Sequence, residues 1–140
     1  MREKLARLIA VIIVVTVFVP AVSAIAAEED KARVQAVITG QIEAFLQDDA
    51  AGAYSYAAPV IRRTFPTPEA FIAMVRRGYS PVYRPQSYSF GQYGMRGDTH
   101  IQSLDVIGPD GQYYVAVYTL METDGGFVIT GCYIKPAQGV

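Results

Sequence analysis

The sequence of 140 residues contains one thiol, Cys132, and one imidazole, His100, which form the only possible Cys–His pair for nucleophilic catalysis. Both lie in segments that predict β-strands, and Cys132 is in step with Val128, Thr130 and Ile134. Because free cysteines are usually buried as small apolar residues, we expect Cys132 to be a buried structural thiol. We expect His100 to be an exposed or strand-start histidine rather than a catalytic base. One Cys and one His cannot build a zinc site, so we expect no metal and no other cofactor.

The carboxylates without a capping, dipole or turn role are Glu43, Asp105 and Glu122. Asp105 stands in the middle of a predicted strand, where Leu104 and Val106 occupy the opposite face, so the pattern leaves open which face is inside. Inside a pocket, Asp105 would have a raised pKa and could act as a general base with Tyr118 or His100. The alternative, which we favour, is a solvated Asp105 on the outer face.

All ten tyrosines lie from residue 54 onward, and several stand close to arginines. The candidate ligand-binding residues in this group are Tyr79, Tyr83, Arg84 and Tyr88. A tyrosine offers apolar area with a polar tip, which suits the mouth of a pocket or a protein interface, and an arginine beside it can bind a carboxylate. Structural packing is the alternative and is favoured, because Arg76 and Arg77 complement the end of a predicted helix.

The first 24 residues have the pattern of a secretory signal peptide. A basic start is followed by the apolar run 8–19, and Val22, Ser23 and Ala24 supply small residues for cleavage. We expect cleavage after Ala24, with a second site after Ala26. Residues 25–140 would then form a single domain that is periplasmic or secreted.

An uncleaved anchor is the alternative, because residues 8–27 are mostly apolar and about long enough to span a bilayer. Contact with a membrane would then occur only through this segment. The formal net charge of −1 excludes a strongly basic nucleic-acid-binding protein. The remaining partners are a small molecule or another protein.

Helical periodicity dominates the first half of the remaining chain. Apolar residues at Val34, Ile38, Ile42 and Phe45 predict an amphipathic helix over 28–47, widened by Val37 and Leu46. Asp49 can cap a second helix over 50–58, which Pro59 is expected to stop. Thr67 and Pro68 predict the start of a third helix that buries Phe71, Ile72 and Val75 and ends before Gly78.

Extended chain is predicted from residue 80, since Ser80-Pro81 and Arg84-Pro85 disfavour helix. The predicted strands are 86–94, 100–107, 112–123 and 127–135, separated by glycine-containing turns. Short connections imply an antiparallel meander. We therefore predict an α+β domain with three helices packed on a four-stranded antiparallel sheet.

Four segments carry a resemblance to a known family: residues 48–55, 65–71, 78–85 and 129–132. They resemble a bacterial family known as domain of unknown function 4864, over essentially all of the mature chain. One departure is Phe127 after two glycines, where a larger aromatic would be expected. The resemblance implies a cystatin-like, nuclear-transport-factor-like α+β fold. It implies no function, because this fold hosts enzymes, binding proteins and assembly domains.

Two functions remain after these exclusions. The leading one is a non-enzymatic binding or assembly module that uses the concave sheet face or the Tyr/Arg surface. The alternative is a small cofactor-free enzyme, isomerase-like or hydrolase-like, in which Asp105 works on a small hydrophobic substrate. Self-association as a homodimer through a sheet edge or the free sheet face is a further possibility.

Overall fold

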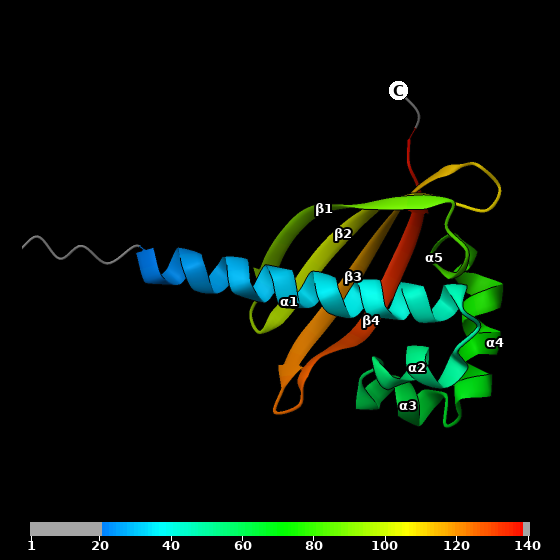
Figure 1. Cartoon of the computed structure of the whole chain (residues 1–140), viewed down its shortest axis with the longest axis horizontal. Helices are drawn as coiled ribbons and strands as arrows, with labels where there is room; N and C mark the ends of the chain where they lie inside the picture. Colours follow the sequence, from blue (N-terminus) through cyan, green and yellow to red (C-terminus); the bar gives the residue numbers. More distant parts are fainter. Residues whose placement is uncertain (1–20, 139–140) are drawn as a thin grey trace, which may run out of the picture.

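The computed structural model describes residues 21–138, which form five helices followed by four strands (Figure 1). The helices are α1 (Ala21–Leu46), α2 (Ala50–Ser55), α3 (Pro59–Thr64), α4 (Pro68–Gly78) and α5 (Ser80–Tyr83). The strands are β1 (Ser87–Arg96), β2 (Thr99–Ile107), β3 (Tyr113–Thr123) and β4 (Gly126–Pro136). Helix α1 crosses one face of the sheet, and the shorter helices gather beside its C-terminal end (Figure 1). The α+β class is confirmed, with five helices in this region rather than three.

Helix α1 places its predicted apolar stripe against the sheet. The stripe residues, each at most 2% exposed, are Val34, Ile38, Ile42 and Phe45. Leu46 is 48% exposed and lies outside the stripe, contrary to expectation. The helix already includes the segment from Ala21 to Ala27, ahead of the predicted start at Glu28, because this alanine-rich segment favours helix. Its first turns extend beyond the body of the domain, where Val22 and Ile25 are exposed (Figure 1).

The predicted signal peptide falls almost entirely on residues 1–20, which lie outside the described residues. Within residues 21–138, none of the helices has both the length and the apolar character needed to cross a membrane.

Two prolines begin helices that the sequence had not led us to expect. Pro59 is the first residue of α3 rather than the stop of α2, and Pro81 lies in the first turn of α5 rather than in extended chain. Proline is compatible with both roles, because the missing N–H is not needed in the first turn of a helix. Helix α2 is correspondingly shorter than predicted, and Asp49 caps it by accepting a hydrogen bond from the Gly52 N–H at 2.9 Å.

Helix α4 agrees with its prediction at the start and along its buried side. The Thr67 hydroxyl accepts a hydrogen bond from the Ala70 N–H at 3.1 Å, as an N-cap does. The predicted inward residues Phe71, Ile72 and Val75 are buried. Gly78 is the last helical residue rather than the residue after it, and its φ is not in the left-handed region.

The sheet is the predicted antiparallel meander in the order β1-β2-β3-β4, and each strand begins and ends within two residues of its expected bounds. Along β2, the alternate residues from His100 to Val106 face the helices and are buried. The intervening residues, Asp105 among them, face outward. The open question of which face Asp105 occupies is thereby answered.

A β-bulge at Thr130 changes the orientation of β4 part-way along the strand. Thr119 pairs with Gly131, whereas Leu120 pairs with Ile129, which leaves Thr130 as the extra residue. Ile129 therefore faces the core before the bulge, and Cys132 faces it after the bulge, opposite Tyr118. The expectation that Val128 and Thr130 share the buried face of Cys132 is wrong for this reason.

Two groups of buried side chains hold the layers together. One lies between α1 and the sheet and includes Ile38, Leu104 and Leu120. The other lies among the helices and includes Phe45 and Phe71, whose ring centroids are 6.3 Å apart. Helix α1 contributes to both groups, so it connects the sheet to the shorter helices.

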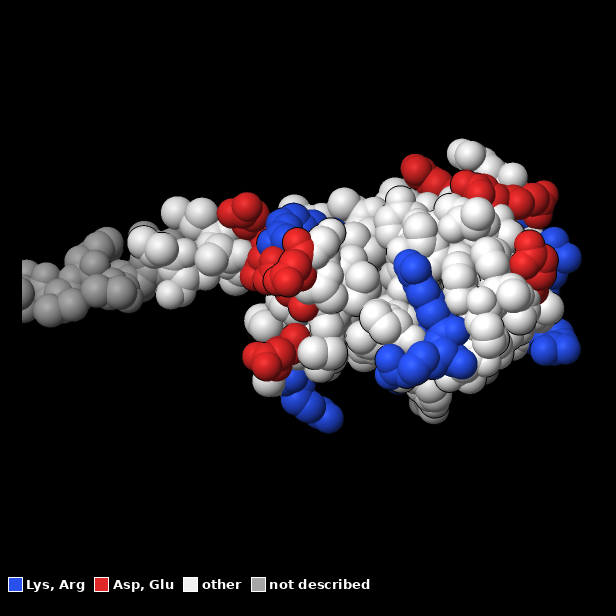
Figure 2. All heavy atoms as spheres, turned by 90° about the horizontal axis from the view of Figure 1, so that it is seen from below, with Lys and Arg blue, Asp and Glu red and all other residues white. Residues whose placement is uncertain are grey.

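Charged side chains form separate groups on the surface in Figure 2, with one acidic group around the place where α1 leaves the body and another at the opposite end of the molecule. Ion pairs fasten the helix there. Arg33 on α1 contacts Asp30 at 3.2 Å and Glu122 of β3 at 2.7 Å. Its guanidinium also lies 4.7 Å from the centroid of the Phe127 ring. Exposed ion pairs of this kind contribute little stability individually but orient α1 on the sheet.

Candidate functional site

An apolar cavity of about 330 Å³ opens between the helices and the C-terminal half of the sheet. Its walls come from α1, α3, α4, α5, β3 and β4 and from the segments that join them. The residues that define its shape are Ile61, Phe65, Phe71, Met74, Val75 and Ile129. Small-molecule sites have volumes from about 300 Å³ upward, so the cavity can hold a small ligand.

The polar groups at the cavity are few and uncharged. They belong to Gln41, Tyr79, Tyr118, Thr130 and Cys132, and none of the described lining residues is Asp, Glu, Lys, Arg or His. The cavity therefore has hydrogen-bonding groups but no ionised side chain on its wall.

Tyr118 supplies the most unusual of these groups. The residue has no solvent exposure, and its hydroxyl is the only fully buried side-chain polar atom in residues 21–138 without a hydrogen-bond partner. Burial raises the pKa of Tyr118 well above its usual value, and the neighbouring Cys132 thiol raises it further. An unpaired buried hydroxyl costs about 1–3 kcal/mol, which a ligand with a hydrogen-bond acceptor would recover.

Cys132 lies directly opposite Tyr118 on β4 and also lines the cavity. The residue is partly exposed rather than fully buried, but loss of water around the sulfur raises the pKa of the thiol to about 12. The thiolate is the nucleophilic form of cysteine, so Cys132 remains an unreactive thiol at neutral pH.

Gln41 is a polar residue on the buried side of α1, 4% exposed. Its side-chain nitrogen donates to the Ala53 carbonyl at 3.2 Å, which leaves the side-chain oxygen as the group that can accept from a ligand. Sequence reasoning did not single out Gln41. The available signal was a glutamine at an inward position of α1, between Ile38 and Phe45.

Among the candidate ligand-binding residues, only Tyr79 lines the cavity. Tyr88 packs at the edge of the sheet core, where its ring meets that of Phe90 edge-on with centroids 6.0 Å apart. Tyr83 and Arg84 belong to a different group of residues at the end of α1. The four candidates therefore do not form one site.

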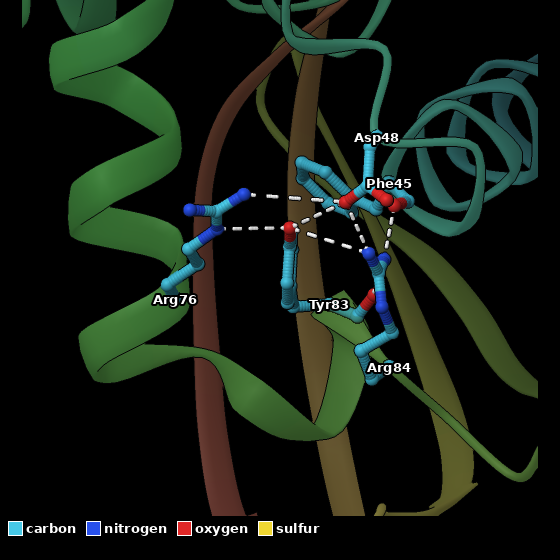
Figure 3. Close-up of polar contacts among 5 residues, drawn as sticks. All are labelled: Phe45, Asp48, Arg76, Tyr83 and Arg84. Carbon is cyan, nitrogen blue, oxygen red and sulfur yellow. Dashed lines mark hydrogen bonds and ion pairs between the residues drawn. The ribbon is translucent and has the colours of Figure 1, made fainter.

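The second group is a polar clamp formed by Asp48, Arg76, Tyr83 and Arg84 (Figure 3). The Tyr83 hydroxyl donates to Asp48 Oδ1 at 3.1 Å and accepts from Arg76 Nε at 2.9 Å. Arg84 donates to the same Asp48 oxygen and to the Phe45 carbonyl. The hydrogen bond from Tyr83, followed by that from Arg84, lowers the pKa of Asp48.

The polar clamp holds the turn that follows α1 against the helices α4 and α5. Asp48 has a φ of 55°, in the left-handed region, so the chain turns sharply there as it leaves α1. The clamp attaches this turn to α4 and α5, and the Arg84 guanidinium stacks 4.3 Å from the Tyr83 ring centroid. The hydrogen bonds of the clamp join its own four residues and the Phe45 carbonyl.

The candidate catalytic residues are not brought together. Asp105 is exposed on the outer face of the sheet, whereas Tyr118 is buried on the inner face. His100 is 4% exposed, so the expectation of an exposed histidine is wrong, although it does stand near the start of β2. Its Nδ1 is 2.7 Å from the Tyr93 hydroxyl, its ring meets Phe127 at 4.6 Å, and it does not line the cavity.

Within residues 21–138, no three His, Cys, Asp or Glu side chains gather as metal ligands would.

Helices packed on an antiparallel sheet with an apolar cavity between them define this chain as an α+β domain. The structure is similar to a crystal structure of a candidate dehydratase of the NTF2-like family from Streptomyces avermitilis, with a TM-score of 0.54. The two share 15% sequence identity over 81% of this chain and 99% of the other, which establishes likeness of fold alone.

The family is established by the sequence itself. Residues 27–140 match the family described as Domain of unknown function (DUF4864), and the chain belongs to that family. No curated protein matches the chain. The resemblance drawn from the four short segments is thereby confirmed.

Proposed function

We propose that this chain is a non-enzymatic binding domain that holds a small, mostly apolar molecule in the cavity. The Tyr118 hydroxyl donates a hydrogen bond to an acceptor on that molecule, such as a carbonyl or ether oxygen. The observation that carries the proposal is that Tyr118, whose fully buried hydroxyl has no hydrogen-bond partner, is one of the residues that line a mostly apolar cavity. A ligand acceptor that pairs with this hydroxyl would offset its desolvation cost of about 1–3 kcal/mol, and this gain would favour binding.

An enzymatic role receives less support from the same residues. Removal of a proton from carbon requires a base that is free to accept it near neutral pH. The titratable groups described at the cavity include Tyr118 and Cys132, and burial raises the pKa of both, which keeps them protonated. The dehydratase activity attributed to the Streptomyces protein is therefore not proposed for this chain.

The binding proposal can be tested with Prodan, a neutral naphthalene dye that has a ketone acceptor and fluoresces more strongly in apolar surroundings. We expect it to bind the wild-type protein and to emit at the red-shifted wavelength of a hydrogen-bonded ketone. Tyr118→Phe should weaken binding by about 5–150-fold and shift the emission to the blue, because the recovery of about 1–3 kcal/mol from pairing the buried hydroxyl is lost.

A pair of tryptophan substitutions on α4 shows whether the dye occupies the cavity. Met74 lines the cavity, whereas its neighbour Ala73 is exposed. Met74→Trp should fill the cavity and abolish binding, and Ala73→Trp should leave it intact. Failure of the wild-type protein to bind, or equal binding by both variants, would contradict the proposal.

We further propose that the domain acts outside the cytoplasm after cleavage behind Ala24 or Ala26. The basic start, the apolar run and the small residues before the cleavage site support this location. The first buried stripe residue of α1 is Val34, so loss of the chain up to Ala26 removes nothing from the core. The intact mass of the protein from the periplasm of its own host tests the proposal, and an unprocessed mass would contradict it.

A further inference from the structure

Strand β4 forms an edge of the sheet, and its backbone is paired on the open side over only part of its length. Before the bulge at Thr130, the Ile129 carbonyl accepts from the Ala58 N–H and the Ile129 N–H donates to the Tyr56 carbonyl, both at 2.8 Å. This short parallel contact ends where Pro59 begins α3. Beyond the bulge, none of the described segments continues the contact along β4.

The direction of the backbone groups beyond the bulge follows from the hydrogen bonds to β3. The Ala137 N–H donates to the Tyr113 carbonyl at 2.9 Å, so Ala137 faces β3. Successive residues of a strand alternate in the side to which their N–H and C=O groups point. Cys132 and Ile134 therefore point away from β3, and none of the described residues bonds to their backbone on that side. Pro136, the next outward residue, has no N–H and ends the row of donors.

This free stretch of β4 borders the mouth of the apolar cavity. The lining residues from α1 and β3 are all buried and form the inner wall. Partly exposed lining residues include Gly131 and Cys132 of β4 and, across from them, Ile61, Phe65 and Met74 of the segment from α3 to α4. The cavity therefore opens between the edge of β4 and these helices.

We propose that the ligand of the cavity is a short extended peptide, which adds to β4 as an antiparallel strand and places one side chain in the cavity. This inference rests on the proposed function, because it requires that the cavity admit a ligand. The peptide residue opposite Cys132 accepts from its N–H and donates to its carbonyl. That residue then lies in one row with Cys132 and Tyr118, on the sheet face that bears the cavity.

The polar groups of the cavity favour tyrosine as the inserted side chain. The Tyr118 hydroxyl has no partner and can donate, whereas the Gln41 side-chain oxygen receives no hydrogen bond from a described residue. A tyrosine hydroxyl can accept from the first group and donate to the second. Its ring suits the apolar remainder of the cavity, whose volume is about 330 Å³.

A second copy of the chain fits this edge less well than a free peptide does. Strand β4 of another copy has the same unpaired groups, but its Cys132 and Ile134 side chains are packed against its own core. Such a partner has no inward side chain left to enter the cavity. A separate peptide supplies both the backbone groups and the side chain.

The test is an NMR titration of the protein with a capped pentapeptide that has a central tyrosine between alanines. The amide protons of Cys132 and Ile134 should move downfield as they become hydrogen-bonded. A methyl group on the tyrosine nitrogen should weaken binding by about tenfold or more, because this N–H points at β4. The same methyl group on the next alanine should have little effect, because that N–H points away from β4.

Ile134→Pro tests the edge from the side of the protein. It removes an outward N–H without breaking a bond to β3, and Pro136 already occupies an outward position of the same edge. Peptide binding should weaken by about fivefold or more, whereas Prodan binding should not change. Ile134→Val keeps the N–H and is the matched control, and circular dichroism reports whether each variant is folded.

The outcomes separate this proposal from the proposed function. Equal binding of the two methylated peptides would overturn the proposal, and this comparison does not depend on the folding of any variant. Prodan binding without a peptide response at about 1 mM would overturn the proposal alone, whereas failure of both ligands would overturn the proposed function as well. A dimer that Ile134→Pro dissociates, without peptide binding, would assign the edge to a second copy and overturn the proposal.

Discussion

Replacement of Tyr118 by phenylalanine should stabilise the ligand-free protein, which is the opposite of the usual effect of removing a buried polar group. The Tyr118 hydroxyl is fully buried and has no hydrogen-bond partner among the described residues. Its removal recovers about 1–3 kcal/mol of desolvation free energy. The space left by one oxygen atom, about 10 Å³, costs only about 0.2 kcal/mol. The free energy of unfolding should therefore rise by about 1 kcal/mol or more.

Tyr54→Phe is the matched control for this substitution. The Tyr54 hydroxyl donates to the Phe65 carbonyl at 2.6 Å, so its removal breaks a real hydrogen bond. The control should lower the free energy of unfolding by about 0.5–1.5 kcal/mol. The two variants thus make the same chemical change with opposite expected signs.

Urea unfolding of both variants and the wild type, each refolded from denaturant to remove bound molecules, measures these differences. The midpoint should rise for Tyr118→Phe and fall for Tyr54→Phe, with unchanged slopes. Destabilisation by Tyr118→Phe equal to that of the control would refute the reasoning. The hydroxyl would then have a partner in the ligand-free protein, and the argument for a ligand acceptor would lose its basis.

Three further predictions concern other parts of the domain. Burial raises the pKa of the Cys132 thiol to about 12. Cys132 should therefore react with iodoacetamide at pH 7.5 more than a hundredfold more slowly than free cysteine. Labelling at the rate of free cysteine would contradict its desolvated position. Thr67→Ala should lower the free energy of unfolding by about 0.5–2 kcal/mol through loss of the N-cap of α4, as denaturant unfolding would measure; no change would mean that the cap is dispensable. Because the pKa of Asp48 is lower in the folded protein than its ordinary value of 3.8, ionised Asp48 stabilises the fold. This stabilisation is fully present above pH 3.8 and is lost as the pH falls through the pKa that Asp48 has in the folded protein. Asp48→Asn, which tolerates the same φ, should therefore reduce the loss of thermal stability below pH 4, and an unchanged acid profile would argue against the polar clamp.

Much of the fold could be predicted because the signals for it are local. The apolar stripe from Val34 to Phe45, the cap at Thr67 and the alternating strands each depend on residues close together in the sequence. The errors at Pro59 and Pro81 are also local, because proline is equally compatible with the end of one helix and the first turn of the next. Local rules do not distinguish the two outcomes.

The candidate site could be predicted only in part. Tyr79, Tyr118 and Cys132 were singled out and do line the cavity, whereas Tyr83 and Arg84 belong to the polar clamp. Gln41 was missed because a single glutamine in an apolar stripe is a weak signal. The cavity is formed by segments from residue 41 to residue 132, and no pattern within one segment shows that the others will meet it.

The sequence by itself determined the family, the order of helices and strands, the meander and the scarcity of catalytic groups. These follow from composition, periodicity and turn residues, which act over a few positions of the chain. Only the tertiary structure decided that Asp105 faces outward, that the bulge at Thr130 turns Cys132 toward Tyr118, and that the Tyr118 hydroxyl has no partner. Burial and hydrogen bonding depend on what packs against each face, and that is settled only when distant segments come together.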